Sequence, residues 1–522
     1  MKPTLEDEGC GVCPHRPVMI EPDFGSFETT YQAGKPQLVW TRLVADLETP
    51  VSAYLKITAN APNSFLLESV EGGDTRGRYS IIGLNPDIIW RSKGNQAEIN
   101  RKAALDAEAF EPCAEDTLTS LRALLEESRL DIPEVLPSMA AGVFGYLGYD
   151  AVRLMEHLPD ENPDALGLPD GLFVRPTVIA VFDSVKDEVI LVTPVRPDAS
   201  VNAKAAFARA SERLNAVIEN FDRPLTHVEE AADAAAIPEP ASNTPKETYF
   251  SMVEQAKEYI LAGDIFQVVL SQRFEAPFDL PPFALYRALR RINPSPYLYF
   301  LNFDGFSIVG SSPEILVKVH DGEVTIRPIA GTRRRGENRA EDAAIEADLL
   351  SDPKERAEHL MLLDLGRNDV GRVAKIGTVE VTDQFALQYT SHLIHIVSNV
   401  RGELDDARYD AISALIAGFP AGTVSGAPKV RAMEIIDELE LEKRGPYAGC
   451  VGYFSAGGNM DTCIVLRTAI VKDGKMYVQA GGGVVADSSP EGEYTESVNK
   501  AKALFRAAEE AVRFASQTGR GQ

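Results

Sequence analysis

Alternating apolar and polar positions predict paired β-strands in several parts of this chain. The runs 178–183 and 188–194 are strand-like and are separated by a short charged turn, which is typical of a β-hairpin. Residues 317–328 repeat the pattern around Asp321-Gly322, a dipeptide that favours tight hairpin turns. A further hairpin is expected around residues 456–459, where small residues separate two apolar runs.

Apolar residues at helical spacing predict several helices in the second half of the chain. They are expected at 249–262, at 339–363 with a break at Asp352-Pro353, and at roughly 491–515. Another helix opens at Pro428, because proline is favoured in the first turn. Its apolar stripe consists of Val430, Met433, Ile436 and Leu439. Strand pairs and long helices without a regular βαβ alternation predict an α+β layered fold.

Composition divides the chain into four expected regions. Residues 1–27 are expected to form a poorly ordered lead-in. Residues 28–228 mix strands with a few helices, and 229–247 is rich in Ala, Pro and acidic residues, as a linker is. Residues 248–516 carry the clearest periodicity and are expected to form a second domain.

Charge and cysteine content narrow the function classes. The 522 residues include 52 basic and 78 acidic side chains, a formal net charge of −26. This balance argues against nucleic acid and anionic membranes as partners, since both require a basic surface. No stretch approaches the roughly 20 apolar residues of a membrane span, and the first residues lack a signal-peptide core. Five cysteines fit a reducing cytoplasm.

A single CxxC, formed by Cys10 and Cys13 and followed by His15, allows two interpretations. It is either a metal or redox site, or part of a tail without function. Structural Zn²⁺ takes four ligands, and no second CxxC exists in the chain. We therefore favour the second interpretation.

Two pairs of acidic residues stand three positions apart on expected helices. Glu355 and Glu358 form one pair, and Glu493 and Glu496 form the other. Each pair shares a helix face. Mg²⁺ prefers oxygen ligands and often takes only one or two carboxylates, so one from each helix would suit it. The spacing alone favours the simpler alternative, a solvated helix face.

Glycine-rich segments and isolated polar residues are further candidates for a ligand site. Glycine lets a ligand approach the backbone, and amides at a helix start favour anions, although a tight turn is an equal alternative for each segment. None matches a nucleotide-binding pattern. Arg467 in an apolar run is either an edge residue or an anion clamp, Lys500 shares a helix face with Glu496, and His395 is either a core histidine or a general acid or base. The glycine segments are Gly331-Thr332, 422–429 with Thr423, and Gly481-Gly482-Gly483.

Seven strings in a fixed order resemble the chorismate-utilising enzymes. Their order and spacing match between residues 328 and 501, which makes the match highly specific. The resemblance implies a layered α/β/β/α sandwich with two large antiparallel-rich sheets. It also implies a catalytic domain at 248–516 and a regulatory region at 28–228. The strings are PIAGTRRRG, ERAEHLMLLDLGRNDVGRVAKIGTVEV, TSHLIHIVSNVRGEL, GTVSGAPKVRAMEII, GPYAGCVGYFS, MDTCIVLRTA and VQAGGGVVADSSPEGEYTESVNKA.

The resemblance implies roles for individual residues. Glu358 and Glu496 would bind Mg²⁺, with Glu355 and Glu493 close behind, and the metal would hold the ring carboxylate of chorismate. Glu314 would protonate the departing ring hydroxyl, and His395 would transfer a proton when pyruvate leaves. Gln267 and Thr423 belong to the same catalytic group. The substrate would be held by Gly331, Thr332, Tyr447, Arg467, Gly481, Gly482, Gly483 and Lys500.

Two positions indicate which nucleophile is used. Water-using members of the family carry Lys where this chain has Gln267, and a glutamine amide is not a base. Members that form aminodeoxychorismate carry a nucleophilic Lys where this chain has Ala330. With neither lysine, direct addition of ammonia and loss of pyruvate would give anthranilate, the first step of tryptophan biosynthesis.

The resemblance further implies feedback inhibition by L-tryptophan. Leu66-Leu67-Glu68-Ser69 and Asn293-Pro294-Ser295-Pro296-Tyr297 resemble the two walls of the family's tryptophan site, with Ser69, Pro296, Tyr297 and Leu298 as contacts. The alternative is a strand end and a rigid turn. The glutaminase pattern Gly-x-Cys-x-Gly is missing around Cys450 and Cys13, so a separate glutaminase subunit is expected to supply ammonia. An aminodeoxychorismate synthase, or a catalytically silent tryptophan sensor, is the alternative reading.

Overall fold

The computed structural model describes residues 19–71, 75–225, 238–390 and 393–515. The CxxC of Cys10 and Cys13 lies outside these residues, as does the first part of the expected linker. Among the described residues, no helix has both the length and the apolar character that crossing a membrane requires.

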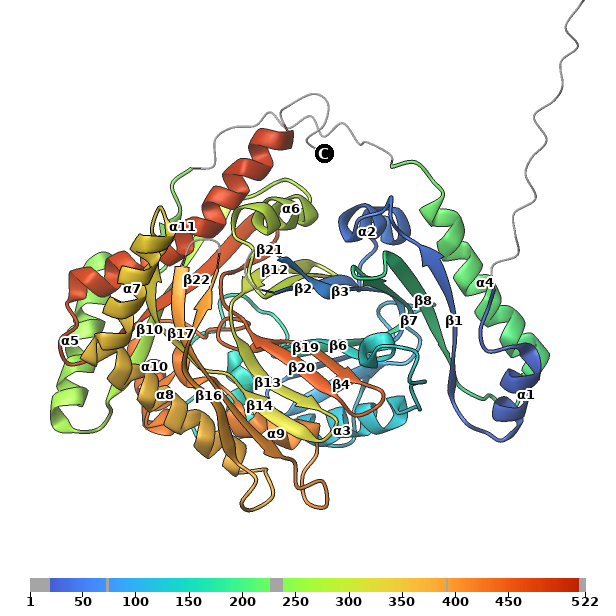
Figure 1. Cartoon of the computed structure of the whole chain (residues 1–522), viewed down its shortest axis with the longest axis horizontal. Coiled ribbons are helices and arrows are strands. Elements are labelled where there is room, and N and C mark those ends of the chain that lie inside the picture. Colours follow the sequence, from blue (N-terminus) through green and yellow to red (C-terminus); the bar gives the residue numbers. More distant parts are fainter. Residues whose placement is uncertain (1–18, 72–74, 226–237, 391–392, 516–522) are drawn as a thin grey trace, which may run out of the picture.

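Among the described residues, antiparallel pairings join the strands into one continuous network, which folds into two facing sheets at the centre of the molecule (Figure 1). The first contains β1 Gln37–Val44, β8 Glu188–Val195, β2 Ser64–Glu71, β11 Tyr297–Phe303, β12 Phe306–Ser312, β21 Thr468–Lys472, β22 Lys475–Val484, β10 Gln267–Pro277 and β9 Ala241–Ser242. The second contains β4 Gln96–Asn100, β6 Gly142–Leu147, β19 Cys450–Ser455, β20 Met460–Ile464, β13 Ile315–His320, β14 Glu323–Ile326, β17 Leu393–Glu403, β15 Ile329–Arg334 and β16 Glu380–Tyr389. Short strands β5 Glu111–Pro112 and β18 Gly426–Ala427 extend β4 and β10.

Two long strands, β3 Thr75–Lys93 and β7 Gly171–Asp183, belong to both sheets. Their register shifts between Pro86 and Ile88, where proline cannot donate a ladder hydrogen bond. Before the shift β3 pairs with β2, and after it β3 pairs with β4. Because β3 and β7 change partners at this register shift, the hydrogen-bonded strands continue from one sheet into the facing one.

Helices cover the outer faces of both sheets, and an apolar core lies between them. One outer core includes residues of α1 Phe24–Gln32, α2 Pro50–Thr58, α4 Ala203–Phe221, α6 Pro282–Ile292 and α11 Pro490–Ala515. The other includes residues of α3 Thr117–Ser128, α5 Lys246–Ala262, α8 Pro353–Gly371, α9 Ala411–Gly418 and α10 Lys429–Leu439. Phe65, Phe144, Tyr146, Tyr299 and Ile470 pack in the core between the sheets. This is the expected layered α+β architecture.

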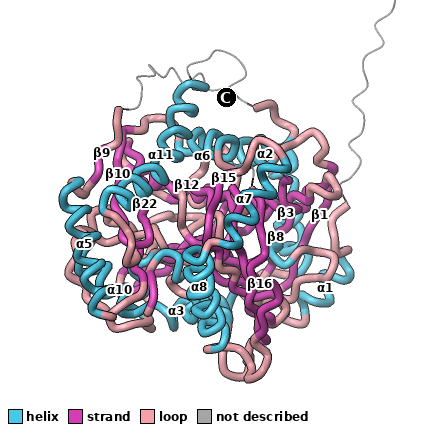
Figure 2. Tube along the Cα trace, turned by 60° about the vertical axis from the view of Figure 1, so that its left-hand side comes forward, coloured by secondary structure: helices cyan, strands magenta, loops and turns pink. Residues whose placement is uncertain are grey.

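The elements expected from the sequence are largely present. The hairpins β7–β8 and β13–β14 form as predicted, and Asp321 and Gly322 both have positive φ, as a tight turn requires. The helix break at Asp352-Pro353 separates α7 Arg339–Ser351 from α8. Asp352 caps α8 by accepting hydrogen bonds from the amides of Lys354 and Glu355, which fixes the start of a helix that carries two of the acidic candidates. Figure 2 brings α7, α8, β15 and β16 forward.

Four sequence expectations need correction. Helix α1 begins at Phe24, so the lead-in expected to reach residue 27 ends inside a helix whose Phe27 is fully buried. The expected linker 229–247 includes β9 and the start of α5 at Lys246. Val430 is exposed rather than part of the buried stripe of α10. Arg467 lies between β20 and β21 with φ +48°, and not within one strand.

Candidate functional site

The glycine segment of β22 lies beside β10, where a side chain would have no room. In this pairing Gly483 lies opposite Val269 and Gly482 lies opposite Leu270. A Cβ atom at Gly483 would stand 2.4 Å from Gln267 Nε2, and one at Gly482 would stand 2.4 Å from Glu493 Oε2. A side chain at either position would have to displace the Gln267 amide or the Glu493 carboxylate, so glycine lets these polar groups pack directly against the backbone.

The four acidic candidates come from two helices and each has one polar neighbour. Glu358 Oε1 accepts a hydrogen bond from Gln267 Nε2 at 3.1 Å, and Glu355 pairs with Arg333 at 2.7 Å. On α11, Glu493 accepts from Ser488 Oγ at 2.7 Å, and Glu496 pairs with Lys500 at 2.7 Å.

Charge repulsion links the two acidic helices. Burial is the main cause that raises the pKa of Glu358, and the charges of Glu355 and Glu496 raise it further. Burial and the charge of Glu496 likewise raise the pKa of Glu493. Because Glu496 acts on both Glu358 and Glu493, α8 and α11 present carboxylates to a common space.

The donor set fits a hard divalent cation that is only partly held by protein. Glu493 Oε2 is buried and has no hydrogen-bond partner, so it offers a free oxygen ligand. Among the residues that the structure describes, no three His, Cys, Asp or Glu side chains are grouped closely enough to hold a metal alone. Mg²⁺ needs only one or two carboxylates when substrate and water supply the remaining oxygens.

Glu314 is a buried carboxyl group in the loop between β12 and β13. Thr423 Oγ1 donates a hydrogen bond to Glu314 Oε2 at 3.1 Å, and the Ile329 backbone gives a second contact. Burial raises the pKa of Glu314 to about 8, and these two hydrogen bonds only partly oppose the rise. The group is therefore protonated at neutral pH and is able to act as an acid.

His395 in β17 is held between two neighbouring strands. Thr332 of β15 and Gln388 of β16 are its cross-strand partners, and Thr332 Oγ1 lies 3.0 Å from His395 Nδ1. His395 Nε2 is buried without a partner. Burial, and then the positive charge of Arg467, lower the pKa of His395 to about 4, so the ring is neutral near pH 7.

A polar cavity joins His395 to Arg467. Its other lining residues are Asn293, Pro294, Ser295, Pro296, Pro313, Ile329, Gln388, Thr390 and Leu393. Burial lowers the pKa of Arg467, with no neighbouring charge opposing the shift. Asn293 Nδ2 and Gln388 Oε1 are buried and have no hydrogen-bond partner within the described part of the chain. Several groups around one cavity therefore still need a hydrogen-bond partner, which is uncommon in a folded protein unless a ligand binds there.

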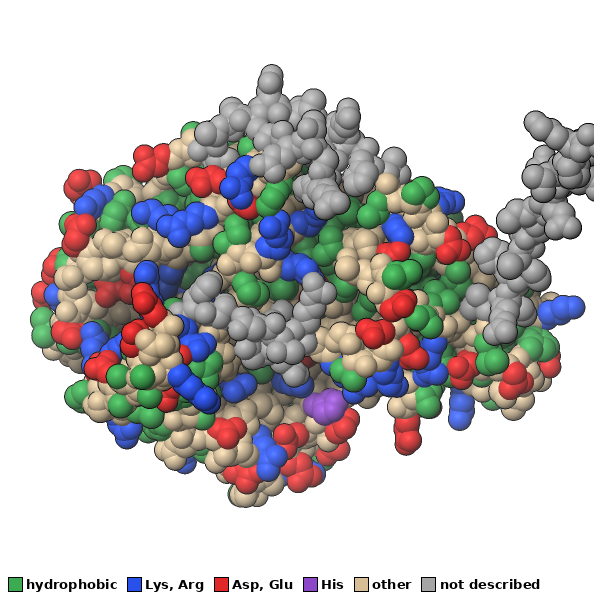
Figure 3. Space-filling view, turned by 45° about the horizontal axis from the view of Figure 1, so that its top comes forward, with side chains coloured by type: hydrophobic (Ala, Val, Ile, Leu, Met, Phe, Trp, Pro, Cys, Tyr) green, Lys and Arg blue, Asp and Glu red, His purple; other side chains and the backbone are tan. Residues whose placement is uncertain are grey.

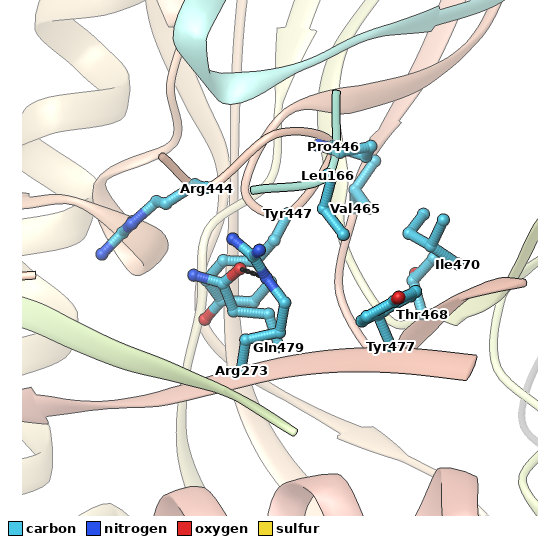
Figure 4. Close-up of a pocket in the computed structure, with 10 residues that line it drawn as sticks. All are labelled: Leu166, Arg273, Arg444, Pro446, Tyr447, Val465, Thr468, Ile470, Tyr477 and Gln479. Carbon is cyan, nitrogen blue, oxygen red and sulfur yellow. Dashed lines mark hydrogen bonds between the residues drawn. The ribbon is translucent and has the colours of Figure 1, made fainter. Parts of the chain in front are cut away.

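A second cavity lies behind Tyr447 and is shown in Figure 4. Tyr447 stacks near the guanidinium of Arg444, 5.5 Å from it. Arg444 is fully buried, pairs with Glu440, and donates to the carbonyl oxygens of Val424 and Val269. This network connects Tyr447 to the loop of Thr423 and to the strand of Gln267. The other lining residues are Leu166, Arg273, Pro446, Val465, Thr468, Ile470, Tyr477 and Gln479.

The remaining candidates for substrate binding surround the acidic groups. Gly331 has φ +69°, and a Cβ there would stand 3.1 Å from Glu355 Oε2. Lys500 Nζ donates to the Gly481 carbonyl at 2.9 Å in addition to its pair with Glu496. The structure thus brings together Gly331, the glycines of β22 and Lys500. Ser69 and Tyr297 lie outside this group, on β2 and β11.

The two segments expected to bind an effector lie on adjacent strands. Ser69 of β2 is directly opposite Tyr297 of β11, and Leu298 is opposite Glu68. Pro296 lines the cavity of His395, while burial and the nearby Asp461 raise the pKa of Tyr297 well above its usual value. The segment 293–297 therefore borders both the cavity of His395 and the strand pair that carries Ser69 and Tyr297.

Figure 3 shows acidic and basic side chains interspersed over the face turned forward there. The net charge of −26 is thus accompanied by local cations. A negatively charged ligand would meet local positive charge at Arg467, where the cavity lies.

Sequence reasoning missed Gln388 and the pair Glu440–Arg444. Gln388 stands two positions before a matched string that begins at Thr390, but only the β16–β17 pairing shows that it lies across from His395. Glu440 and Arg444 are four residues apart, which is the only signal that the sequence offers.

Comparison with known proteins identifies the family of this chain. Residues 69–506 match the family described as chorismate binding enzyme. The chain is 58% identical over 498 residues to anthranilate synthase component 1 of Cereibacter sphaeroides, covering 95% of this chain and 99% of that protein. It is 49% identical to the Pseudomonas aeruginosa protein of the same name, covering 89% and 94%.

Two solved structures of related proteins have the same fold. Anthranilate synthase component I from Streptococcus pneumoniae aligns with a TM-score of 0.73 and 39% identity, over 82% of this chain and 92% of that one. The Escherichia coli isochorismate synthase MenF aligns with a TM-score of 0.68 at 18% identity, over 93% and 99%, and shows the fold alone. The chain therefore belongs to the chorismate binding enzyme family, and the relatives that it matches over nearly its whole length are anthranilate synthase component 1 proteins.

Proposed function

We propose that this enzyme converts chorismate and ammonia into anthranilate and pyruvate in a Mg²⁺-dependent reaction. The observation that carries the proposal is Glu314, a carboxyl group that burial keeps protonated at neutral pH beside the cavity of His395 and Arg467. Hydroxide is a poor leaving group, so a reaction that removes the ring hydroxyl of chorismate needs an acid at this position. The names of the close relatives support the same reaction.

Substrate binding would use both ends of the site. Chorismate carries two carboxylates, and Arg467 has a guanidinium whose charge is opposed by no carboxylate among the residues that the structure describes. Glu358 and Glu496 would hold Mg²⁺, with Glu355 and Glu493 close by. When bound, Mg²⁺ would neutralise the ring carboxylate and draw electron density from the ring. Tyr447, Gly331, Thr332, the amides of Gly481–Gly483 and Lys500 would line the remaining surface.

The nucleophile would be ammonia rather than water or a lysine. Gln267 Nε2 is occupied by Glu358, and its Oε1 is buried without a partner. That oxygen is able to accept a hydrogen bond from ammonia and to orient its lone pair, but an amide does not deprotonate water. Ala330 offers no amine. Aminodeoxychorismate formation is therefore disfavoured.

Loss of pyruvate would follow from proton transfer at His395. A neutral imidazole with an unpartnered Nε2 is able to accept a proton from the ring carbon as the enolpyruvyl group leaves. Thr332 fixes the ring by its contact with Nδ1. Thr423 would hold the Glu314 carboxyl in position for the preceding step.

Two further observations support feedback inhibition by L-tryptophan and a glutaminase subunit as partner. Ser69, Pro296, Tyr297 and Leu298 surround adjacent strand ends, and Pro296 also lines the catalytic cavity. L-tryptophan bound there would displace the segment 293–296 and close the site. Ammonia would come from a glutaminase subunit, because the chain lacks a Gly-x-Cys-x-Gly nucleophile turn.

An assay with the purified chain tests this proposal. Chorismate, MgCl₂ and an ammonium salt at mildly alkaline pH should give the blue fluorescence of anthranilate. EDTA should abolish the signal and tryptophan should reduce it. Folded protein that leaves chorismate unchanged, or gives another product by mass spectrometry, would refute the proposed reaction.

A further inference from the structure

Gln388, the cross-strand neighbour of His395 on β16, has no role in the reaction outlined above. Gln388 lies directly across from His395 in the β16–β17 pairing, whereas Thr332 lies across from it on β15. Residues that face each other across antiparallel strands point to the same side of the sheet. Gln388 therefore shares the cavity of His395, and it is among the residues that line it.

The hydrogen-bonding groups around this cavity differ in what they require. Arg467 and Asn293 Nδ2 are donors and need an acceptor, which a carboxylate supplies. Gln388 Oε1 is an acceptor without a partner and needs a donor. Leaving such an atom buried and unpaired costs about 1–3 kcal/mol, so a bound group is expected to satisfy it. The last torsion of glutamine is broad, so a small rotation turns Oε1 toward a ligand.

Chorismate has only one group able to meet that need. At neutral pH both of its carboxylates are ionised and its ether oxygen is an acceptor, so the ring hydroxyl is its sole hydrogen-bond donor. We propose that Gln388 is a specificity-determining residue that accepts a hydrogen bond from the ring hydroxyl of chorismate through Oε1. This inference rests on the proposed function, because it takes chorismate as the substrate.

The contact would also position the hydroxyl for its departure. A hydroxyl group donates one hydrogen bond and still has lone pairs to accept a proton. While Gln388 holds the hydrogen, Glu314 gives its proton to the oxygen. The lone pair of ammonia forms the new C–N bond, the ring double bonds shift, and the C–O bond breaks to release water. Pro313 and Ile329 line the cavity; Pro313 directly precedes Glu314 in the chain, and the Ile329 backbone contacts the Glu314 carboxyl, so this carboxyl group lies at the edge of the cavity.

Gln267 is the competing candidate, because its Oε1 is also unpartnered. Its amide nitrogen, however, is bound to Glu358, which places it at the acidic helices and away from the residues that line the cavity of His395. The two glutamines are therefore expected to respond differently when the substrate hydroxyl is removed.

The test compares chorismate with an analogue in which hydrogen replaces the ring hydroxyl. Equilibrium binding to the full chain is measured with Mg²⁺ and without ammonium, so that no turnover occurs. The unaltered protein should bind the analogue about tenfold more weakly, since Gln388 Oε1 then stays unpaired. Gln388→Leu should bind the two ligands within about twofold of each other, and Gln388→Glu, which keeps an acceptor, should retain the preference.

Matched controls exclude a merely structural effect. Gln384→Leu changes an exposed glutamine of the same strand and should leave the tenfold preference intact. Thermal unfolding of each variant reports its stability independently of the ratio. A preference that survives in Gln388→Leu, or one that Gln267→Leu removes instead, would overturn the assignment.

The outcomes also separate this inference from the proposed reaction. Chorismate binding with the preference lost in Gln388→Leu supports the inference even if no anthranilate is formed with ammonium. Anthranilate formation with an unchanged preference in Gln388→Leu contradicts the inference and leaves the reaction standing. Absence of chorismate binding by the unaltered protein contradicts both.

Discussion

Two buried polar regions lie close together in this molecule, yet they differ in how their hydrogen bonds are met. Around Arg444, the guanidinium donates to both oxygens of Glu440 and to two backbone carbonyls. Around His395, by contrast, buried polar atoms of Gln388, Asn293 and the histidine itself lack partners. The Arg444 network is complete without a ligand, whereas the cavity of His395 is not.

The difference separates structural from functional polar groups. A buried ion pair with every bond satisfied holds elements in place, and removing one partner leaves an uncompensated charge. Buried groups that stay unpaired cost free energy in the absence of ligand, so the protein retains them where a ligand repays that cost. Mutations in the two regions should therefore affect different observables.

The largest effect is expected from Glu358→Gln, which removes a carboxylate from the acidic helices. It should lower kcat/KM by at least about 10³-fold, because the developing charge loses its electrostatic support. The unfolding free energy should stay equal or increase, since burial, and then repulsion by Glu355 and Glu496, raises the pKa of Glu358 and so disfavours its charged form. Kinetics and denaturant unfolding of the same preparation check both parts. Full activity at ordinary Mg²⁺ concentration would remove Glu358 from the metal site.

Arg444→Met should show the opposite pattern. It should lower the unfolding free energy by about 3–5 kcal/mol, because Glu440 remains buried without its partner. The double substitution Arg444→Met with Glu440→Leu serves as the control and should recover much of the loss. Urea unfolding measures both. A stable single variant with a normal melting profile would show that this pair does not hold the fold.

Glu314→Gln should reduce kcat by about 10²–10⁴-fold, since the amide donates no proton. The pKa of Glu314 is about 8, so the rate of the unaltered enzyme should fall as pH rises through that value. Thr423→Val, which removes the hydrogen bond to the carboxyl, should move this limb to higher pH. Measuring kcat of both proteins between pH 6 and 9.5 tests the position of this limb. A rate that does not change with pH would exclude Glu314 as the acid.

Glu314→Gln should also change how the stability of the protein depends on pH. The folded pKa of about 8 lies above the ordinary value of 4.5, so folding stabilises the protonated form. That contribution is complete below about pH 4 and is lost as pH rises through 8. Glutamine does not titrate. The stability of Glu314→Gln relative to the unaltered protein should therefore improve from pH 5 to pH 9, as thermal melting measures.

Ser69→Arg is expected to have the smallest effect on catalysis. Its site lies on β2, opposite Tyr297, while the catalytic groups lie around β17 and α8. The rate without effector should change by less than about twofold, as for a substitution outside the site. Inhibition by tryptophan should disappear, because the larger charged side chain fills the pocket. Unaltered inhibition in a titration would place the effector elsewhere.

Much of the fold follows from the sequence because local signals agree with it. The turn at Asp321-Gly322 and the helix cap at Asp352 are set by neighbouring residues, and both appear as expected. The break at Arg467 was not predicted, because the run around it is continuously apolar. Its left-handed backbone is imposed by the surrounding strands.

The candidate site shows the same limit. The family resemblance singled out Glu314, His395 and the acidic pairs as candidates, and the structure shows the contacts of each. The contact of Thr423 with Glu314 joins distant parts of the chain, and the place of Gln388 beside His395 depends on the register of β16 and β17; local periodicity encodes neither. Exposure of Val430 likewise follows from the orientation of α10 in the assembled layers.

The central claim is tested most directly with ¹⁵N-labelled ammonium. The purified chain is incubated with chorismate and MgCl₂, and the aromatic product is identified by mass spectrometry beside the Glu314→Gln variant. We predict anthranilate carrying one ¹⁵N, together with an equal amount of pyruvate, and little of either from the variant. A product that lacks ¹⁵N, or one that retains the enolpyruvyl group, would contradict the account.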